Sequence, residues 1–470
     1  MRLYNTFTRK IEDFNPLNHP KVGLYTCGFT VYDYAHIGSM SKYIRDDVLR
    51  RALTYLGYKV KHVQNVTDVG HLASDADEGE DKMEKGAKKY GKTVWEVAQF
   101  YTDYFYNTMD AANVLRPDII CKATDHIQDM IDLIKILEEK KYTYETEEAV
   151  YFDVSKFPQY NTLSGQKLED KKEGVREEVQ VDPKKKNPAD FALWFKRVGR
   201  FANHAMHWPS PWGEGFPGWH IECSAMSMKY LGPTIDIHTG GVDHIPVHHP
   251  NEIAQSEAAT GKQFVKYWVH HAHILVNGQK MSKSLNNFYT IDDVRKENID
   301  PLALRLLFLQ SHYRQQSNFT WESARAAQEA YKKLKDTVLT LRKQTDRTVL
   351  SEEKLKKIDE YRQRFTDAIA NDLQTPQAVA IMWEMLKSNI PSPDKLDLLL
   401  EFDQVFGLQL DQVQDVEEKI PDEIQTLAKQ RDEYKKEKNY AKADEVRKKI
   451  SEEGYIIEDL GTEYKIKKAQ

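Results

Sequence analysis

The pattern that decides the fold lies in residues 22–66, which read VGLYTCGFTVYDYAHIGSMSKYIRDDVLRRALTYLGYKVKHVQNV. The apolar run at 22–27 predicts a buried strand, and a loop is expected over 29–39. Apolar spacing over 42–56 predicts an amphipathic helix, and a second strand is expected over 59–66. This order predicts a βαβ unit, and therefore a parallel sheet that binds a nucleotide at its carboxyl edge.

A second half of the same sheet is expected after an interruption. Helices are predicted over 93–113 and 124–139. Between about 140 and 210 the pattern breaks into short strands, a lysine run and a Pro/Gly-rich stretch. Strand-like sequence resumes at 235–238 and 269–276. These features predict an α/β fold in which a Rossmann-like, parallel, nucleotide-binding sheet is split by an insertion.

Helices are expected to dominate the rest of the chain. A leucine-rich segment from Leu302 to Leu309 opens a long helical periodicity, which predicts an α-helical bundle. The last fifty residues are expected to form a small C-terminal α+β unit, with apolar helix faces followed by a hairpin that turns at Gly461-Thr462. The expected divisions are 1–118 and 208–275 for the two halves of the sheet domain, 119–207 for the insertion, 276–315 for a lysine-rich loop and the region after it, 316–418 for the bundle, and 419–470 for the terminal unit.

Composition restricts the class of protein. A length of 470 residues predicts two to four domains. The charged fraction of 30% and the mean hydropathy of −0.68 predict a soluble protein without a membrane span. The N-terminal residues lack an apolar core of signal-peptide length, so a cytoplasmic location is expected. Three widely spaced cysteines argue against a disulfide framework, and the net charge of −6 means that any nucleic acid would be bound by local patches.

A lysine- and serine-rich loop follows the last predicted strand of the sheet. The run GQKMSKSLNNF at 278–288 comes after an Asn277-Gly278 turn signal and contains Lys280, Lys283 and Ser284. Ammonium groups at a mobile loop tip can meet the negative charge of a leaving pyrophosphate. Lys280 and Lys283 are therefore expected to close over the β- and γ-phosphates of ATP. Taken alone, the run could also be a solvated basic loop.

Two glycine-containing segments complete the predicted ATP site. His36 and Gly38 lie where a loop meets a helix N-terminus, whose free N–H groups favour phosphate. Gly38 would let adenosine approach the backbone, and His36 can donate to phosphoryl oxygens. After the strand at 235–238, Gly241 belongs to a second glycine turn, and Asp243 is placed to bind ribose hydroxyls. A histidine alone is more often structural, but these neighbours favour a nucleotide site.

Two further motif matches are interpreted as coincidence. Residues 86–93, GAKKYGKT, satisfy the P-loop pattern, but the polar run before them cannot form the buried strand that a P-loop needs. Thr93 is expected instead to open a helix through a capping box with Glu96. Residues 213–218, GEGFPG, satisfy the dinucleotide fingerprint, yet they contain a proline and follow a Pro/Trp-rich run instead of a strand.

The two phosphate-handling motifs resemble a known signature pair. HIG at 36–38 with KMSKS at 280–284 resembles that of class I aminoacyl-tRNA synthetases. Cys27, GWHIECSAM at 218–226 and HHPNEIAQSEA at 248–258 are similar to cysteinyl-tRNA synthetases in particular, and the similarity extends over essentially the whole chain. The resemblance implies that the carboxylate of cysteine attacks the α-phosphate of ATP, bound with Mg²⁺, and that the acyl group then moves to the terminal adenosine of tRNA. Alignment and charge dispersal carry such chemistry, so no protein nucleophile is required.

The resemblance also implies one zinc ion per chain. By position, the family's zinc ligands correspond to Cys27, Cys223, His248 and Glu252. His248 and Glu252 are four residues apart and would share a helix face, and the four donor types suit Zn²⁺. Spacing alone is a weak signal here, because buried free cysteines would look the same. No role is predicted for Cys121.

Zinc offers a physical means of selecting cysteine. Packing alone distinguishes side chains of such similar size by only about 1–3 kcal/mol. A zinc ion that binds the substrate sulfur as a thiolate would instead reject a serine hydroxyl, so no editing domain is expected. By resemblance, the residues around the amino acid are Thr67, Trp219 and His238, although Trp219 could equally belong to the core.

Three positions depart from the family pattern. Ser39 stands where the first motif often ends in a second histidine, so a charge that could stabilise the transition state is absent there. Pro250 replaces a residue that is usually acidic, and proline is compatible with the first turn of a helix. His248 and His249 are adjacent, and motif alignment alone selects the first as the ligand.

The expected partners are L-cysteine, ATP and cysteine tRNA, with no membrane, and the chain is expected to act as a monomer. NIDPLALRLLF at 298–308 resembles the start of the bundle that supports tRNA in this class. The terminal unit would read the anticodon, although acidic residues are about as numerous there and a solvated face is the alternative. Its basic residues are Lys435, Lys436, Lys438, Lys448, Lys449, Lys465, Lys467 and Lys468.

Two other functions are compatible with parts of the sequence. A cysteine ligase that passes activated cysteine to an amino-sugar would share the sheet and the zinc site. The helical bundle and the terminal unit argue against it, because a small acceptor needs no anticodon reader. A non-catalytic, zinc-dependent nucleic-acid-binding protein would leave His36 and the loop from Lys280 to Ser284 unexplained.

Overall fold

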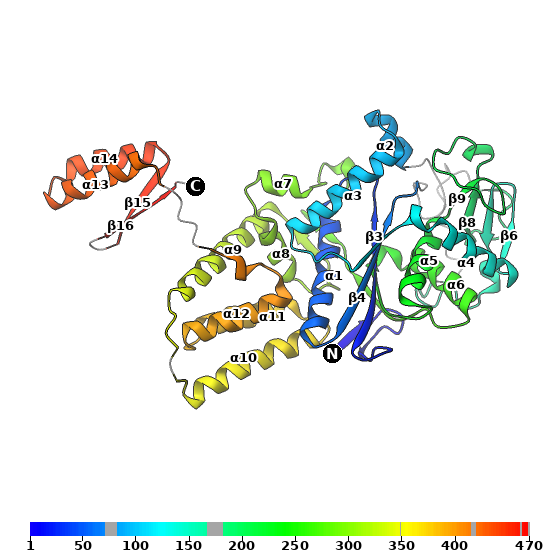
Figure 1. Ribbon diagram of the computed structural model, residues 1–470, viewed down its shortest axis with the longest axis horizontal. Helices are drawn as coiled ribbons and strands as arrows, with labels where there is room; N and C mark the ends of the chain where they lie inside the picture. Colours follow the sequence, from blue (N-terminus) through cyan, green and yellow to red (C-terminus); the bar gives the residue numbers. More distant parts are fainter. Residues whose placement is uncertain (71–81, 167–181, 348, 415–419, 461–462, 469–470) are drawn as a thin grey trace. The chain divides into compact units, whose positions relative to one another are not determined.

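The computed structural model describes residues 1–70, 82–166, 182–347, 349–414, 420–460 and 463–468 (Figure 1). The chain forms two compact units, Met1–Gln412 and Val413–Gln470, and each is described here by itself. The finer divisions expected from the sequence stay predictions. Among the described residues, no helix has the length and apolar character needed to cross a lipid bilayer.

A five-stranded parallel sheet forms the centre of the first unit. Its strand order is β11-β10-β3-β4-β5, so the two halves of the sheet meet where β3 pairs with β10. The predicted βαβ unit and parallel sheet are confirmed. The strands are β3 (Lys21–Thr30), β4 (Lys59–Thr67), β5 (Ile119–Lys122), β10 (Ile235–Gly241) and β11 (Val265–His271), and β11 also contacts the N-terminal hairpin of β1 (Arg2–Asn5) and β2 (Lys10–Asp13).

Helices cover both faces of this sheet (Figure 1). On one side an extensive apolar core joins the sheet to three helices through buried side chains such as Tyr25, Val63, Ile134, Ile221 and Ile253. These helices are α4 (Ile127–Glu139), α5 (Trp219–Leu231) and α6 (His248–Thr260), and the opposite face carries α1 (Ile37–Tyr55) and α3 (Val94–Ala111), with α2 (Lys82–Tyr90) packed on α3.

The insertion forms a separate antiparallel sheet of order β6-β7-β8-β9. Its strands are β6 (Thr143–Glu145), β7 (Ala149–Phe152), β8 (Phe191–Lys196) and β9 (Gly215–Pro217). β9 lies inside the GEGFPG run, and close approach to β8 explains two of its three glycines, Gly215 and Gly218. A Cβ on Gly215 would lie 1.9 Å from the carbonyl oxygen of Phe195, and one on Gly218 would lie 2.0 Å from that of Ala192. The glycines therefore permit close strand approach, as expected if the fingerprint match is a coincidence.

The P-loop match also has a different structure. Residues 86–90 belong to α2, and Thr93 is the N-cap of α3. The Thr93 hydroxyl accepts a hydrogen bond from Glu96 N at 3.2 Å, and the Glu96 carboxylate accepts one from Thr93 N at 2.8 Å. The predicted capping box is confirmed.

Two strand and loop boundaries predicted from the sequence are wrong. β3 continues to Thr30 and α1 starts at Ile37, so the loop predicted over 29–39 is much shorter. Gly241 is the last residue of β10, so the glycines at 240–241 belong to a strand and not to a turn. Glycine lacks a side chain that would reveal a strand by its hydrophobicity, which explains the second error.

The strand predicted over 269–276 is divided between two sheets. β11 ends at His271, and β12 (Ile274–Val276) pairs with β13 (Gln279–Lys280) and β14 (Ser317–Phe319). The break is at Ala272, whose N–H donates to the carbonyl of Tyr313 at 2.8 Å and whose carbonyl accepts from Arg45 at 2.7 Å. Arg45 and Tyr313 are distant from Ala272 in the sequence, so the apolar run around residue 272 does not indicate the break.

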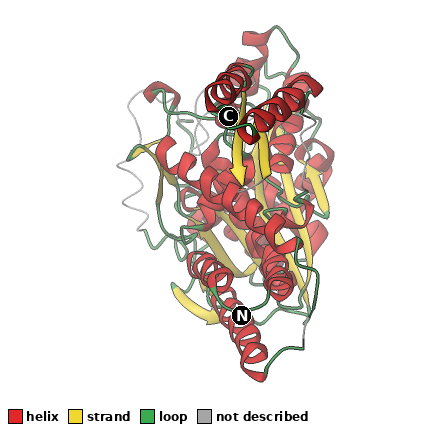
Figure 2. Ribbon diagram, turned by 90° about the vertical axis from the view of Figure 1, so that its left-hand side faces the viewer, coloured by secondary structure: helices red, strands yellow, loops and turns green. Residues whose placement is uncertain are grey.

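The predicted helical bundle is present and is joined to the sheet through a buried charge pair. Arg305 donates to the Asp47 carboxylate of α1 at 2.5 Å, and both side chains are fully buried. Figure 2 distinguishes the helices from the strands by colour. The helices from this region onward are α7 (Ile291–Lys296), α8 (Pro301–Leu309), α9 (Trp321–Arg342), α10 (Glu352–Ala370), α11 (Thr375–Lys387) and α12 (Ser392–Phe406).

The second unit has the predicted order of two helices and a hairpin. It contains α13 (Asp422–Lys436), α14 (Tyr440–Glu452), β15 (Tyr455–Leu460) and β16 (Glu463–Lys468). Leu460 pairs with Glu463, which confirms the hairpin, while the predicted turn residues Gly461 and Thr462 lie outside the described residues. The expected helix faces form its core, where Ile424, Ala443, Val446 and Ile450 are buried.

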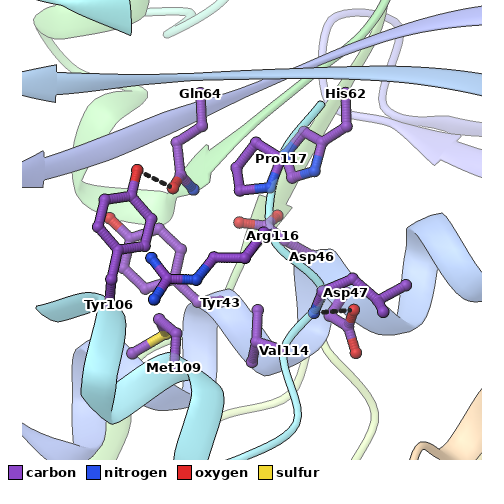
Figure 3. A pocket seen from close by; sticks show the side chains of 11 residues that line it. Tyr43, Asp46, Asp47, His62, Gln64, Tyr106, Met109, Val114, Arg116 and Pro117 are labelled. Carbon is purple, nitrogen blue, oxygen red and sulfur yellow. Dashed lines mark hydrogen bonds between the residues drawn. The ribbon is translucent and has the colours of Figure 1, made fainter. Parts of the chain in front are cut away.

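A small cavity lies between α1 and the sheet (Figure 3). Tyr43 and Asp46 reach it from α1, and His62 and Gln64 reach it from β4. Its volume of about 10 Å³ is close to the space that a single water molecule needs. His62 contacts the Thr26 hydroxyl at 2.9 Å and Arg50 at 3.4 Å.

Replacing His62 with glutamine should make the free energy of unfolding depend less on pH between about pH 6.5 and 4. Burial, followed by the Arg50 charge, lowers the pKa of His62 to about 4. The unfolded imidazole would bind a proton near pH 6.5, so stability is lost as the pH falls from about 6.5 to 4, by about 3 kcal/mol at most. Midpoints of urea unfolding, measured at pH 7 and 4.5, should differ less for His62→Gln than for the wild type. Equal pH slopes for the two proteins would contradict this assignment.

Candidate active site and metal centre

A cleft of about 360 Å³ opens at the carboxyl edge of the parallel sheet. The ends of four strands contribute Thr30, Thr67, Gly241 and His271 to its lining. Its position matches the nucleotide site expected for this type of sheet. The other lining residues are Cys27, Gly28, Phe29, Tyr32, His36, Gly38, Ser39, Lys42, Tyr43, Asn65, Trp219, Cys223, Asp243, His244, His248, Ala272, His273, Ile274, Lys280 and Met281.

His36 is the N-cap of α1 and has a defined tautomer. Ser39 N donates to His36 Nδ1 at 3.2 Å, so Nε2 carries the proton of the neutral ring. Burial lowers the pKa of His36 to about 4, which keeps it neutral near pH 7. A Cβ on Gly38 would lie only 2.8 Å from the His36 ring, so glycine is required for this arrangement. The result is one N–H donor beside the free N–H groups of a helix N-terminus.

Asp243 also lines the cleft and follows the end of β10. A Cβ on Gly241 would lie 2.1 Å from the Asp243 carboxylate, and one on Gly240 would lie 2.5 Å from the His249 ring, so both glycines make room for side chains of the site. Burial acts to raise the pKa of Asp243, but His244 and His273 hold it below its usual range. An ionised carboxylate at this edge can accept hydrogen bonds from sugar hydroxyls.

The lysine-rich loop begins as a hairpin. Asn277 and Gly278 form its turn with positive φ angles, and Lys280 of β13 lines the cleft. Lys283 lies in a short 3₁₀ turn that follows, where it forms an ion pair with Asp33. Ser284 contacts the Ser282 hydroxyl at 2.7 Å. The structure therefore places Lys283 and Ser284 outside the cleft lining, and their contact with phosphate stays a prediction.

Four donor groups converge at the floor of the cleft. The ligand atoms of Cys27, Cys223, His248 and Glu252 lie within 4.8 Å of one another, and all four residues are buried. They come from β3, α5 and α6. Because α6 starts at His248, His248 and Glu252 share a face of this helix, and His248 Nε2 lies 3.1 Å from a carboxylate oxygen of Glu252. Pro250 lies in the first turn of α6, where proline is tolerated.

The donor chemistry of this quartet fits zinc. Burial raises the pKa of Cys27, whereas the pKa of Cys223 is raised chiefly by its contact with Cys27 and then by burial. Burial by itself would raise the pKa of Glu252, but contacts with His238 and His248 outweigh it and lower this pKa to about 2. Two sulfurs, an imidazole and a carboxylate are zinc's preferred ligands, and a divalent cation would compensate their buried negative charge.

A second quartet shares two of these residues. Cys27, His238, His249 and Glu252 also bring their ligand atoms within 4.8 Å of one another. His249 Nε2 lies 3.5 Å from the Cys27 sulfur, and its Nδ1 contacts His270 at 2.7 Å. Only the quartet that contains His248 unites both thiols, which supports the alignment-based choice of His248. The Nδ1 atom of His248 lies 2.8 Å from His220 Nδ1, and this contact from outside the quartet can orient the His248 ring.

Two of the three residues expected around an amino acid line the cleft. The ring of Trp219 lies 5.0 Å from that of His248, so it faces the site instead of the core. The Thr67 hydroxyl donates to Glu222 at 2.9 Å. His238 is fully buried, contacts Glu252 at 2.8 Å and does not line the cleft, so its place beside an amino acid stays a prediction.

Several residues of the site were not anticipated from the sequence. Lys42 and His271 line the cleft, Asp33 pairs with Lys283, and Asn65 donates to the Thr67 hydroxyl at 3.0 Å. Lys42 lies four residues after Gly38, so its helical spacing could have indicated a shared face. The others depend on contacts between distant segments.

Sequence comparison identifies relatives over nearly the whole chain. Residues 13–329 match the family described as "tRNA synthetases class I (C) catalytic domain". A Cysteine–tRNA ligase of Treponema denticola is 43% identical and one of Caldicellulosiruptor saccharolyticus is 44% identical, and each alignment covers 98% of both chains. One of Borreliella burgdorferi is 40% identical over 100% of this chain and 99% of its own.

Solved structures show the same fold at low sequence identity. A LeuRS–tRNA–LeuAMS ternary complex of Agrobacterium radiobacter has a TM-score of 0.60 at 11% identity, over 85% of both chains. Methionyl-tRNA synthetase of Mycobacterium tuberculosis, in complex with methionyl-adenylate, has a TM-score of 0.55 at 14% identity, over 83% of this chain and 88% of that one. Together with the family match and the full-length relatives, these findings show that the chain belongs to the cysteine–tRNA ligase family of class I synthetases.

Proposed function

We propose that this chain activates L-cysteine with ATP and transfers it to the 3′ end of cysteine tRNA. The observation that carries the proposal is the opening of the buried Cys27/Cys223/His248/Glu252 quartet into the same cleft as His36, Gly38 and Lys280. A thiol-selective floor and a nucleotide-binding wall are thereby within reach of one small substrate. Neither alternative function requires both features together with a helical bundle and a terminal unit.

Positioning and charge carry the first reaction. The cysteine carboxylate oxygen attacks the α-phosphorus of ATP, the new carboxyl–phosphate bond forms, and the bond to the departing pyrophosphate breaks. His36 Nε2–H and the N-terminus of α1 donate to phosphate oxygens, Asp243 accepts from the ribose, and Lys280 with Lys283 stabilises the pyrophosphate, with Mg²⁺ accompanying ATP.

The floor of the cleft would select the amino acid. Cys27, Cys223, His248 and Glu252 would hold the zinc ion, which, when bound, supplies a Lewis acid that takes the substrate sulfur as a thiolate. His238 and His220 orient the ligands Glu252 and His248 from behind. Trp219 and Thr67 would border the amino acid on the open side.

The helical bundle and the terminal unit would bind the tRNA. In the described part of the terminal unit, Lys435 pairs with Asp459 and Lys436 with Asp432, whereas exposed Lys449 and Lys465 have no ion-pair partner. Unpaired cations can neutralise RNA phosphates without first losing another partner. A monomer that works in the cytoplasm is the simplest assembly for this role.

Reversing the charge of Lys449 and Lys465 together should weaken tRNA binding without affecting amino-acid activation. Phosphate contacts contribute most of the affinity, so the KM for cysteine tRNA should rise about tenfold in 0.1 M salt. Cysteine-dependent pyrophosphate exchange should stay at the wild-type rate. A matched variant with Lys10→Glu and Lys21→Glu, both exposed at the N-terminal strands, should leave both activities unchanged. An unchanged KM in the Lys449→Glu/Lys465→Glu protein would contradict the assigned role of the terminal unit.

Two assays test the proposed function directly. Cysteine-dependent exchange of pyrophosphate into ATP separates an enzyme from a non-catalytic binding protein. Cysteinylation of tRNA, compared with transfer to an amino-sugar, then separates a synthetase from a sugar ligase. Exchange activity without tRNA charging, accompanied by transfer to an amino-sugar, would overturn the proposal in favour of the sugar ligase.

A further inference from the structure

Lys42 lines the cleft on the same helix face as the nucleotide-binding end of α1. Gly38, Lys42 and Asp46 follow one another at intervals of four, so they stack one turn apart. Gly38 and Lys42 both line the cleft. Lys42 therefore lies one helical turn inward from the proposed phosphate-binding N-terminus.

The ammonium of Lys42 is held in place but keeps donor capacity. Its Nζ donates to the Cys27 carbonyl at 2.5 Å and lies 3.0 Å from the Asp46 carboxylate. Its remaining contact is with the Tyr43 ring, 4.2 Å from the centroid, which accepts no conventional hydrogen bond. An ammonium has three N–H donors, so one can serve a ligand in the cleft. The side chain is 14% exposed, and the cleft is the space to which it is exposed.

Asp46 fixes the position of this charge. It is 2% exposed, and its second oxygen contacts His271 Nε2 at 2.7 Å. Burial acts to raise the pKa of Asp46, but Lys42 and His271 hold it well below its usual range, so the carboxylate is ionised. Asp46 is thus held between Lys42 and His271, and its carboxylate fixes the position of the Lys42 ammonium.

Lys42 shares the cleft with both proposed substrate sites. Its Nζ donates to the backbone carbonyl of Cys27, which belongs to the quartet, and it lines the same cleft as Asp243. A cysteine bound by its sulfur at the quartet, and ATP bound by its ribose at Asp243, would place the carboxylate and the α-phosphate between these two points, in the cleft that Lys42 lines.

The cleft offers few other fixed cations for this role. Ser39 provides an uncharged hydroxyl, 3.4 Å from His36 Nε2. Burial lowers the pKa of His36 to about 4, so this ring is neutral near pH 7. Of the described residues that line the cleft, Lys42 and Lys280 are the lysines, and Lys280 is exposed on the hairpin.

We infer that the Lys42 ammonium is a catalytic group that binds the α-phosphate and the attacking carboxylate as the adenylate forms. It offsets the charge that accumulates where two anions meet, while the carboxyl–phosphate bond forms and pyrophosphate leaves with its electron pair. Lys42 thereby supplies the positive charge that position 39 lacks. This inference rests on the proposed adenylation activity.

Three variants separate this role from a structural one. Lys42→Met removes the charge and keeps the aliphatic stem, Asp46→Asn removes the supporting carboxylate, and Lys42→Met/Asp46→Asn avoids an unpaired buried aspartate. In cysteine-dependent pyrophosphate exchange, both proteins that lack Lys42 should lose about 100- to 1,000-fold in kcat. Asp46→Asn alone should lose less than about tenfold, because the ammonium remains in the cleft. Zinc content should stay at the wild-type level in all three.

A matched control is Lys140→Met. Lys140 Nζ also donates to a backbone carbonyl, that of Ala259 at 2.7 Å, but lies outside the cleft. This variant should exchange at the wild-type rate. Equal losses in Asp46→Asn and Lys42→Met, or a wild-type rate in Lys42→Met/Asp46→Asn, would show that Lys42 only supports the fold. If the wild-type protein itself shows no cysteine-dependent exchange, the proposed function fails; if only the variants behave as wild type, this inference alone fails.

Discussion

Replacing Cys223 with serine should release the metal and lower cysteine activation by at least about 100-fold. Cys223 is one of two thiols in the buried quartet and is 1% exposed. A serine hydroxyl does not ionise near neutral pH, so it cannot replace a thiolate ligand. Metal analysis of the purified protein and cysteine-dependent pyrophosphate exchange measure the two effects.

Cys121 provides the control for this variant. It is also 1% exposed, but its thiol donates to the carbonyl of Gln64 at 3.4 Å and takes part in neither quartet. Cys121→Ser should therefore keep both the metal and the exchange activity, apart from a small loss of stability. Full zinc content and full activity in Cys223→Ser would contradict the assignment of the metal centre.

Replacing Lys283 with alanine should lower adenylation by about 100- to 1,000-fold while leaving the fold intact. Its ion pair with Asp33 is on the surface, with 60% of the Lys283 side chain exposed, so its loss should cost less than about 1 kcal/mol. The charge becomes important only when pyrophosphate departs. The kcat of cysteine-dependent exchange, compared with the midpoint of thermal unfolding, separates the two effects.

Lys92 is the matching control, because it belongs to the rejected P-loop match. It is exposed, and its ammonium lies 5.0 Å from the centre of the Phe100 ring. Lys92→Ala should leave exchange unchanged. Loss of activity in Lys92→Ala with normal activity in Lys283→Ala would overturn the rejection of the P-loop.

Features with a local physical signal could be predicted from the sequence. The βαβ unit followed from hydrophobic spacing, the Thr93 capping box from its polar pair, and the terminal hairpin from its turn residues. The convergence of Cys27, Cys223, His248 and Glu252 was expected only through resemblance, because its residues come from three separate elements.

Features set by distant contacts could not be predicted. Arg45 and Tyr313 interrupt the strand at Ala272, although nothing near residue 272 in the sequence indicates a break. The apolar periodicity of α1 indicates which face packs against the core, and it carries no signal for the polar face on which Lys42 contacts the cleft. His238 is expected beside the amino acid; it contacts Glu252 at 2.8 Å and does not line the cleft, and its role there stays a prediction.

Zinc X-ray absorption of the protein, recorded before and after addition of L-cysteine, tests the central claim most directly. The quartet of Cys27, Cys223, His248 and Glu252 contains two sulfurs. If the metal takes the substrate as a thiolate, the count of sulfur neighbours should rise from two to three with L-cysteine and stay at two with L-serine. A spectrum that does not change on addition of L-cysteine would show that the metal does not select the substrate.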